Sequence, residues 1–230
     1  MAKAGDEIVN PRTGQRMVFL ETGRETGGQS LRIDTYYPPT GVPEPEHVHP
    51  FQVSGAEILS GFLRFRVGGV ERLVGVGESI TITANTPHHF WNDGEEEARS
   101  VQWFRPALKT DRFFESFFGL AQDGKVNEQG FPSLLQLAVS ASYFGDEIRL
   151  TSPPWPVQRI LFGTLAPIGR VFGYRPEYPY LHASTQEFTA GEERPSAARR
   201  AMTGSVVVAT FVALILFFTL LRHRRRRGGK

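Results

Sequence analysis

Between residues 16 and 105 the chain is built from short stretches in which apolar and polar residues alternate. In LRFRV, for example, Leu63, Phe65 and Val67 alternate with two arginines, which places the apolar side chains on one face of a strand. Glycine- and proline-containing turns separate the stretches. Many short strands of this kind are typical of a sandwich, a barrel or a jelly roll. The expected strands are Arg16–Leu20, Leu31–Tyr37, His47–Val53, Ala56–Ser60, Phe62–Val67, Val70–Val74, Ser79–Thr83, His88–Asn92 and Ala98–Phe104.

After Pro106 the apolar residues recur with a helical period instead. Helices are expected over Asp111–Ala121, Phe131–Ile148 and Pro156–Tyr174. The third helix carries an apolar stripe at i, i+3 and i+4 spacing, formed by Val157, Ile160, Leu161, Leu165, Ile168 and Phe172. Such a stripe predicts a helix packed on the β-domain. The alternative is a helix that lies on a membrane surface.

The segment AMTGSVVVATFVALILFFTLL, residues 201–221, carries no charge and is followed by the basic tail RHRRRRGGK. At about 1.5 Å per residue, a helix of this length matches the hydrocarbon thickness of a bilayer. The sequence therefore predicts one C-terminal transmembrane helix. The expected organisation is a β-barrel at 1–106, a helical extension packed on the barrel or on the membrane surface at 107–181, a polar tether at 182–200, the transmembrane helix at 201–221 and a basic tail at 222–230.

The distribution of charge along the chain bears on nucleic-acid binding and on membrane orientation. The formal net charge is +2, but the tail holds six of the 26 basic residues, so residues 1–221 are mildly acidic. This excludes a basic nucleic-acid footprint on the body of the protein. The N-terminal residues lack an apolar signal segment, which favours a cytoplasmic barrel on a single-pass protein, whereas the basic tail by itself favours a cytoplasmic C-terminus. The absence of cysteine excludes disulfides, thiolate metal ligands and a cysteine nucleophile.

Four of the six histidines occur in two clusters, HVH at 47–49 and HH at 88–89. On strands, His47 and His49 face the same side, and His88 shares its side with Phe90 and Asn92. His89 and Trp91 face the opposite side. We expect His47, His49 and His88 to converge inside the barrel, where neutral imidazoles can bind Zn, Fe, Ni, Mn or Cu and leave positions open for water or substrate.

These segments resemble the two motifs of the cupin superfamily. PEHVHPFQVSGAEILSGFLRFRVGG is similar to G(x)5HxH(x)3–4E(x)6G, and GVGESITITANTPHHFWNDGEE is similar to G(x)5PxG(x)2H(x)3N. The matching positions are His47, His49, Gly61, Gly77, His88 and Asn92. The resemblance covers roughly residues 30–105. It implies a double-stranded β-helix (jelly-roll) barrel, a divalent metal held by three histidines and one glutamate, a small-molecule pocket in the barrel mouth and a homodimer. The flanking segments FRPALKTDRFFESFFGLAQDG and SPPWPVQRILFGTLAPIGRVFGYRP also resemble an uncharacterised, membrane-anchored bacterial subgroup of cupins, which implies no activity.

The chain departs from the cupin pattern at the glutamate ligand. That position falls on Ser54, or on Val53 with the alternative spacing, and neither side chain is a good ligand. Losing the carboxylate is expected to weaken the binding of hard metals such as Mn more than that of Zn, Ni or Cu. Gln52 offers an amide oxygen, but strand parity turns it away from His49 unless a bulge intervenes. In the second motif Asn85 replaces a glycine, and asparagine tolerates the positive φ required there.

Three functional interpretations stay open. The first is a metal-dependent oxygenase or isomerase of small molecules that uses the His47, His49 and His88 centre. The second is a ligand-sensing cupin that has lost its metal, and the third is a scaffold that positions partners at the bilayer. Glu57, which follows the first motif's histidines, is expected to face outward, so the motifs supply no evident general base. In the first two interpretations the pocket is expected to be lined by Phe62, Phe65, Phe90 and Trp103.

Overall fold

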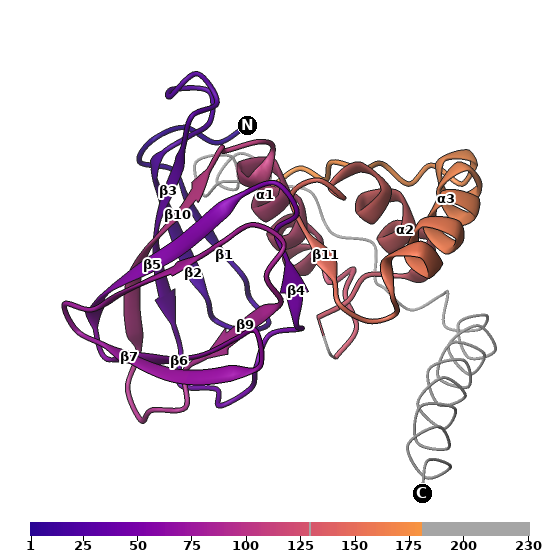
Figure 1. Ribbon diagram of the computed structural model, residues 1–230. Coiled ribbons are helices and arrows are strands. Elements are labelled where there is room, and N and C mark those ends of the chain that lie inside the picture. Colours follow the sequence, from indigo (N-terminus) through magenta and orange to yellow (C-terminus); the bar gives the residue numbers. More distant parts are fainter. Residues whose placement is uncertain (129, 181–230) are drawn as a thin grey trace, which may run out of the picture. The chain divides into compact units, whose positions relative to one another are not determined.

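In the residues that the computed structural model describes, 1–128 and 130–180, two antiparallel sheets form a barrel (Figure 1). One sheet has the strand order β1-β2-β3-β10-β5-β8, and the other has the order β11-β4-β9-β6-β7. The strands are β1 (Glu7–Val9), β2 (Arg16–Glu21), β3 (Leu31–Tyr37), β4 (His47–Val48), β5 (Val53–Ser60), β6 (Phe62–Val67), β7 (Val70–Gly75), β8 (Ser79–Ile82), β9 (His88–Trp91), β10 (Ala98–Arg105) and β11 (Arg149–Leu150). The predicted antiparallel β-barrel is confirmed.

Apolar side chains that alternate with polar ones along the strands point between the two sheets and form the core there. Ile58 and Ile80 of the first sheet pack in one buried cluster with Leu63, Phe65 and Val74 of the second. The glycines and the asparagine of the two motifs make the turns that join these strands, since Gly61, Gly77 and Asn85 all have positive φ, with Asn85 at 59°. The turn geometry expected at Asn85 is therefore present.

The expectation of a single strand over His47–Val53 is wrong. The chain forms the two-residue strand β4, turns at residues 49–52 and then begins β5 at Val53. Pro50 lies in this turn, where its missing N–H cannot continue the ladder of hydrogen bonds. The short strands β1 and β11 were not expected either. β11 pairs with β4 and so extends the second sheet with a segment from far along the chain.

Three helices follow the barrel, α1 (Thr110–Gln122), α2 (Leu134–Tyr143) and α3 (Trp155–Val171). All three were expected, although α2 is shorter than predicted and begins after Ser133, whose side chain accepts a hydrogen bond from the Gln136 N–H. α1 packs on residues of the first sheet. There Phe118 belongs to one buried cluster with Phe19, Ile33 and Phe104.

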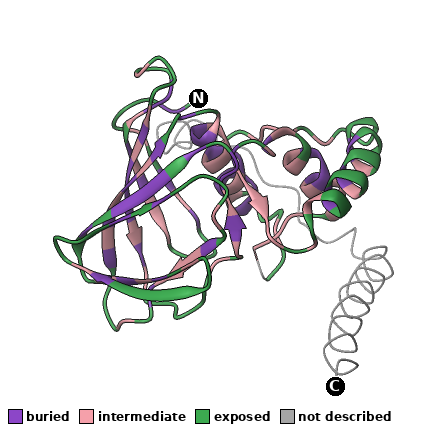
Figure 2. Cartoon of the chain, viewed as in Figure 1, coloured by how far each residue is buried: buried purple, intermediate pink, exposed green. Residues whose placement is uncertain are grey.

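The apolar stripe predicted for the third helix does not form its packed face. Ile160 and Phe172 are 72% and 73% exposed, and α3 instead buries Phe162, Ala166 and Gly169. Most of this helix is exposed (Figure 2). This face packs on α2 at close range, because a Cβ added at Gly169 would lie 2.6 Å from Val139 Cγ2 and 3.0 Å from the Leu135 carbonyl oxygen. The lack of a side chain at Gly169 thus allows this face of α3 to approach α2 closely.

The expected transmembrane helix at 201–221, the tether at 182–200 and the tail at 222–230 lie outside the described residues. Within the described ranges, none of the helices combines the length and the apolarity needed to cross a membrane.

Two glycines of α3 test the close contact with α2. Gly163 has open space around its added Cβ, so Gly163→Ala is expected to raise the free energy of unfolding by about 0.5–1 kcal/mol through helix propensity. Gly169→Ala receives the same gain but collides with α2, which costs about 1–3 kcal/mol. Thermal unfolding followed by circular dichroism measures the difference between the two variants. Equal stability of the two would contradict the close packing.

Candidate metal centre

The structure brings His47, His49 and His88 together in the barrel. Each side chain offers a ring nitrogen, and these ligand atoms lie within 4.8 Å of one another. His47 of β4 pairs directly with His88 of β9, and His49 follows β4 by one residue. All three imidazoles are buried, and their ring centroids are 4.4 to 5.2 Å apart. His89 and Trp91 lie on the other face of β9, as strand parity predicts, with their rings in contact at 5.4 Å.

Each of the three histidines has its Nδ1 held by a backbone carbonyl. Because a carbonyl oxygen only accepts hydrogen bonds, each Nδ1 carries the proton, and the lone pair remains on Nε2. This tautomer is the one that binds a metal through Nε2. The acceptors are the carbonyls of Pro45 for His47 (2.9 Å), Glu147 for His49 (2.6 Å) and Thr86 for His88 (2.8 Å).

Burial keeps the three imidazoles in their neutral form. It lowers the pKa of His47, His49 and His88, and the pKa of His49 falls to about 4. The neighbouring imidazoles lower these pKa values further, since a positive charge on one ring disfavours a charge on the next. At neutral pH the centre therefore presents neutral nitrogen donors, and a metal need not displace protons from them.

The fourth ligand position of the resembled pattern holds a hydroxyl. Ser54 is buried, lies opposite Phe104 and Ile82 in the first sheet and lines the cavity beside the histidines. Among the described residues, no carboxylate joins the three histidines in a ligand group. Glu57 is exposed, as expected. The donor set present is therefore three imidazole nitrogens, which fits Zn, Ni, Cu or Fe better than the hard cations that prefer oxygen ligands.

Gln52, the other oxygen donor considered, has a structural role. Its side chain is fully buried, and its Nε2 lies within hydrogen-bond distance of the carbonyls of Pro106 and Ala107 and of Thr110 Oγ1. The turn after His49 directs Gln52 toward the start of α1. It thus connects the barrel to the helices and does not complete the metal site.

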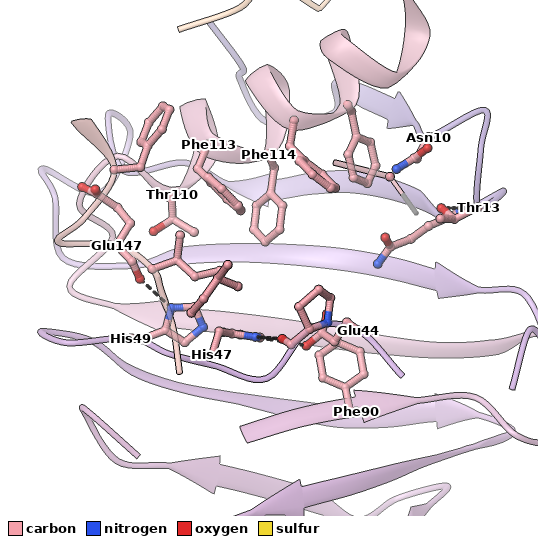
Figure 3. Close-up of a pocket in the computed structure, with 18 of the residues that line it drawn as sticks. Asn10, Thr13, Glu44, His47, His49, Phe90, Thr110, Phe113, Phe114 and Glu147 are labelled. Carbon is pink, nitrogen blue, oxygen red and sulfur yellow. Dashed lines mark hydrogen bonds and ion pairs between the residues drawn. The ribbon is translucent and has the colours of Figure 1, made fainter. Parts of the chain in front are cut away.

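A cavity of about 570 Å³ adjoins the three histidines and extends between the barrel and the helices (Figure 3). Its lining contains Phe65 and Phe90, as expected, but not Phe62 or Trp103. Trp103 alternates with Gln102 and Phe104 along β10, and these two line the cavity, so the indole lies on the other face of the strand. Its expected role in the pocket is not supported.

The cavity lining also contains phenylalanines of α1 and a carboxyl group that were not expected from the sequence. Phe113 and Phe114 face His47 and His49 across it (Figure 3). The repeated FF pairs of DRFFESFFGL are the signal in the sequence, but only the fold shows that these rings lie over the barrel mouth. The carboxyl group is that of Glu44, three residues before His47.

Glu44 lies beside the centre without belonging to its ligands. Its Oε1 is buried, has no hydrogen-bond partner in the described part of the chain and lies 3.7 Å from His47 Nδ1. Burial raises the pKa of Glu44 to about 8. Because the His47 ring is neutral at neutral pH, its 3.7 Å contact with Glu44 is not a charged ion pair.

The barrel with three converging histidines that could hold a metal ion is typical of one class of β-barrel proteins, which the comparison with known families names. The family model described as "Cupin domain" matches residues 34–104, so this part of the chain is a cupin domain. The resemblance to a membrane-anchored bacterial subgroup stays a prediction.

A curated relative and several solved structures are similar to this chain. A protein from Arthrobotrys oligospora named as an oxidoreductase is 25% identical over 154 residues, which are 61% of this chain and 60% of the relative. This chain thus spans about 60% of that relative's length. A predicted oxalate decarboxylase from Thermotoga maritima is 18% identical, with 45% of this chain and 93% of that chain covered and a TM-score of 0.40. An RmlC-like cupin from Shewanella frigidimarina is 16% identical, with 46% and 88% covered and a TM-score of 0.39.

Two neighbouring positions of β5 test the assignment of the missing ligand. Ser54 lines the cavity, whereas Val53 is 37% exposed and points away from it. We expect Ser54→Glu to tighten metal binding by about tenfold or more, and by more for Mn²⁺ than for Zn²⁺, because the carboxylate adds a charge and an oxygen donor. Val53→Glu is the control and should leave affinity unchanged. Competition titration with a chromogenic chelator measures both. No gain for Ser54→Glu would refute the assignment.

Proposed function

We propose that the cupin domain holds a divalent transition metal on His47, His49 and His88 and acts as a metal-dependent oxidoreductase on a small, largely apolar molecule bound beside it. The observation that carries the metal site is the convergence of three buried imidazoles whose Nδ1 atoms are all engaged by backbone carbonyls. When bound, a metal on such a site supplies Lewis-acid or redox chemistry at its open positions.

The lining of the cavity supports an apolar ligand. Phenylalanines approach it from both sides, with Phe65, Phe90 and Phe104 from the barrel and Phe113, Phe114 and Phe117 from α1. Large rings of this kind bury apolar surface at about 25 cal/mol per Å². The site therefore favours an aromatic or aliphatic compound of modest size.

The charged groups of the lining argue against a phosphorylated or strongly anionic ligand. Its arginines are Arg12 and Arg149, and each is engaged elsewhere. Arg12 donates to the Glu128 carbonyl, and Arg149 donates to the Gly145 carbonyl and lies 3.9 Å over the Trp155 ring. Recognition of a phosphate normally uses basic groups that are free to converge on it.

Glu44 gives the ligand one polar contact next to the metal. Its buried Oε1 has no hydrogen-bond partner among the residues that the structure describes, and a buried polar atom of this kind is stabilised when a ligand hydrogen-bonds to it. A molecule that combines an apolar body with a hydroxyl, carbonyl or amide group satisfies both requirements. The protein's contribution is to orient that group beside the histidines and to exclude water with the phenylalanines.

The reaction class is suggested by the name of the Arthrobotrys relative, an oxidoreductase. The second candidate is a non-catalytic sensor that binds the same ligand, and Ser54 favours it, since this residue replaces the family's carboxylate ligand. Consumption of ligand by metal-loaded protein separates the two candidates, because a sensor returns its ligand unchanged.

We also propose that residues 201–221 anchor the protein in a membrane. The support is the uncharged apolar run, whose length as a helix matches the thickness of a bilayer. The basic residues that follow this run favour a cytoplasmic position for residues 222–230.

Elemental analysis of the purified full-length protein tests the metal centre. We expect stoichiometric transition metal in the parent and loss of it in the double variant His47→Ala/His88→Ala, because one remaining imidazole cannot hold the ion. His89→Ala is the matched control, since this neighbouring ring faces the other side of β9. The control should keep its metal. Equal occupancy in the parent and the double variant would contradict the proposal.

Proton line broadening by a paramagnetic metal tests the ligand class. In copper-loaded protein the signals of apolar aromatic or short aliphatic compounds should broaden, because they bind close to the metal, whereas those of sugar phosphates should not. Zinc-loaded protein, which is diamagnetic, and copper-treated His47→Ala/His88→Ala are the controls and should cause much less broadening than copper-loaded protein. Selective broadening of the sugar phosphates would overturn the apolar assignment.

A further inference from the structure

The wall that the first sheet contributes to the cavity contains a polar pair, Ser54 of β5 and Gln102 of β10. Both residues line the cavity, and they are only 4% and 8% exposed. Their neighbours in the lining are apolar, since Ala56, Ile82 and Phe104 belong to the same part of the barrel. A polar side chain buried among apolar ones costs free energy unless it is hydrogen-bonded, so we asked which groups satisfy this pair.

The register of the sheet places the two side chains next to each other and close to the histidines. Ser54 pairs with Phe104, and Gln102 pairs with Ala56, which is two residues further along each strand. Ser54 and Gln102 are therefore diagonal neighbours on the inner face, with Cα atoms about 7–8 Å apart, and both side chains can reach one atom between them. The ring centroids of Phe104 and His49 are 5.2 Å apart, which puts the pair beside the candidate metal centre.

The amide group of Gln102 has an unused donor end. Its Oε1 accepts a hydrogen bond from the Thr35 hydroxyl at 3.3 Å, which leaves the NH2 group, Nε2, directed away from this contact. Within the described ranges, neither Nε2 nor Ser54 Oγ has a hydrogen-bond partner. A water held by this pair alone would make two hydrogen bonds, fewer than the three usual for a buried water, so a ligand can displace it at little cost.

The unused groups of the pair define the complementary group on the ligand. The Gln102 NH2 can only donate, and the Ser54 hydroxyl can donate as well, so the ligand has to supply an oxygen acceptor. A carboxylate or a phosphate fits less well, because the arginines of the lining are engaged elsewhere and the lining includes the carboxyl groups of Glu44 and Glu147. A carbonyl oxygen accepts two hydrogen bonds and brings no charge into the cavity.

We propose that Ser54 and Gln102 form a subsite for the carbonyl oxygen of the ligand, which makes the ligand a neutral aromatic or aliphatic carbonyl compound such as a ketone, an ester or an amide. This inference rests on the proposed function, since it names the substrate class of the same site. Ser54 then has a role of its own at the position where the cupin pattern has a carboxylate ligand. The two hydrogen bonds do not require the metal, so the two proposals can fail separately.

Infrared difference spectroscopy with acetophenone tests the subsite in the zinc-loaded full-length protein. Comparing the ketone with and without carbon-13 at its carbonyl separates the C=O stretching band from the bands of the protein. We expect the bound ketone to absorb at lower wavenumber than in hexane, because hydrogen bonds weaken the C=O bond. The shift should become smaller in Gln102→Leu and in Ser54→Ala. Val101→Thr, on the other face of β10, is the matched control and should keep the shift.

Titrations of the same variants measure the effect on affinity. Acetophenone and ethylbenzene have similar shapes and are compared in one detergent, so that partitioning of each compound is the same for every variant. Gln102→Leu should weaken the binding of acetophenone about fivefold, as the loss of one hydrogen bond predicts, and should not weaken that of ethylbenzene. Circular dichroism and thermal unfolding check that each variant is folded. Ser54→Ala provides the same comparison if Gln102→Leu does not fold.

A carbonyl band at its position in hexane, or equal losses of both compounds in Gln102→Leu, would overturn the subsite and leave the metal centre standing. A lowered band that both single variants keep would also overturn it, and loss of that shift in His47→Ala/His88→Ala would then assign the oxygen to the metal. Failure of both compounds to bind would overturn the carbonyl class together with the apolar ligand. A lowered band in protein that holds no zinc would contradict the metal centre alone.

Discussion

The hydrogen bonds from three imidazole Nδ1 atoms to backbone carbonyls are the constraint on which the metal centre depends. Two of the carbonyls, those of Pro45 and Thr86, precede their histidines by two residues and come from the barrel itself. The third belongs to Glu147, which follows α2 and is 98 residues from its partner His49. The orientation of one candidate metal ligand, His49, is therefore set by a residue that follows α2, outside the matched cupin region.

Glu147 strengthens this connection through its side chain. The carboxylate accepts a hydrogen bond from the Lys109 N–H at the start of α1, and its Oε1 lies 3.6 Å from Lys109 Nζ. Gln52 makes a second link from the barrel to the same helix start through Thr110. These buried polar contacts hold α1, and with it the phenylalanines that close the cavity over the histidines. The matched cupin region, residues 34–104, contains the three ligands but only part of what orients them.

Local patterns in the sequence predicted the barrel, the three helices and the convergence of His47, His49 and His88, because each follows from strand parity, helical period or spacing. Contacts between distant segments were not predictable in this way. Glu147 as partner of His49, and the phenylalanines of α1 over the cavity, appear only once the chain is folded. The apolar stripe on α3 shows a further limit of prediction from sequence. The helical period identified an apolar face, but this face is exposed because α3 packs on α2 through its opposite side, at Gly169.

The position of α3 makes this helix part of the cavity wall. On its inner side Phe162 and Gln158 line the cavity, and on its outer side Ile160 and Val171 are exposed. A helix backbone with its side chains is only about 10 Å across. Along α3 the cavity wall is therefore only one helix thick. Substitutions at Gln158 or Phe162 change the shape of the cavity while they leave the three histidines and the strands that carry them in place.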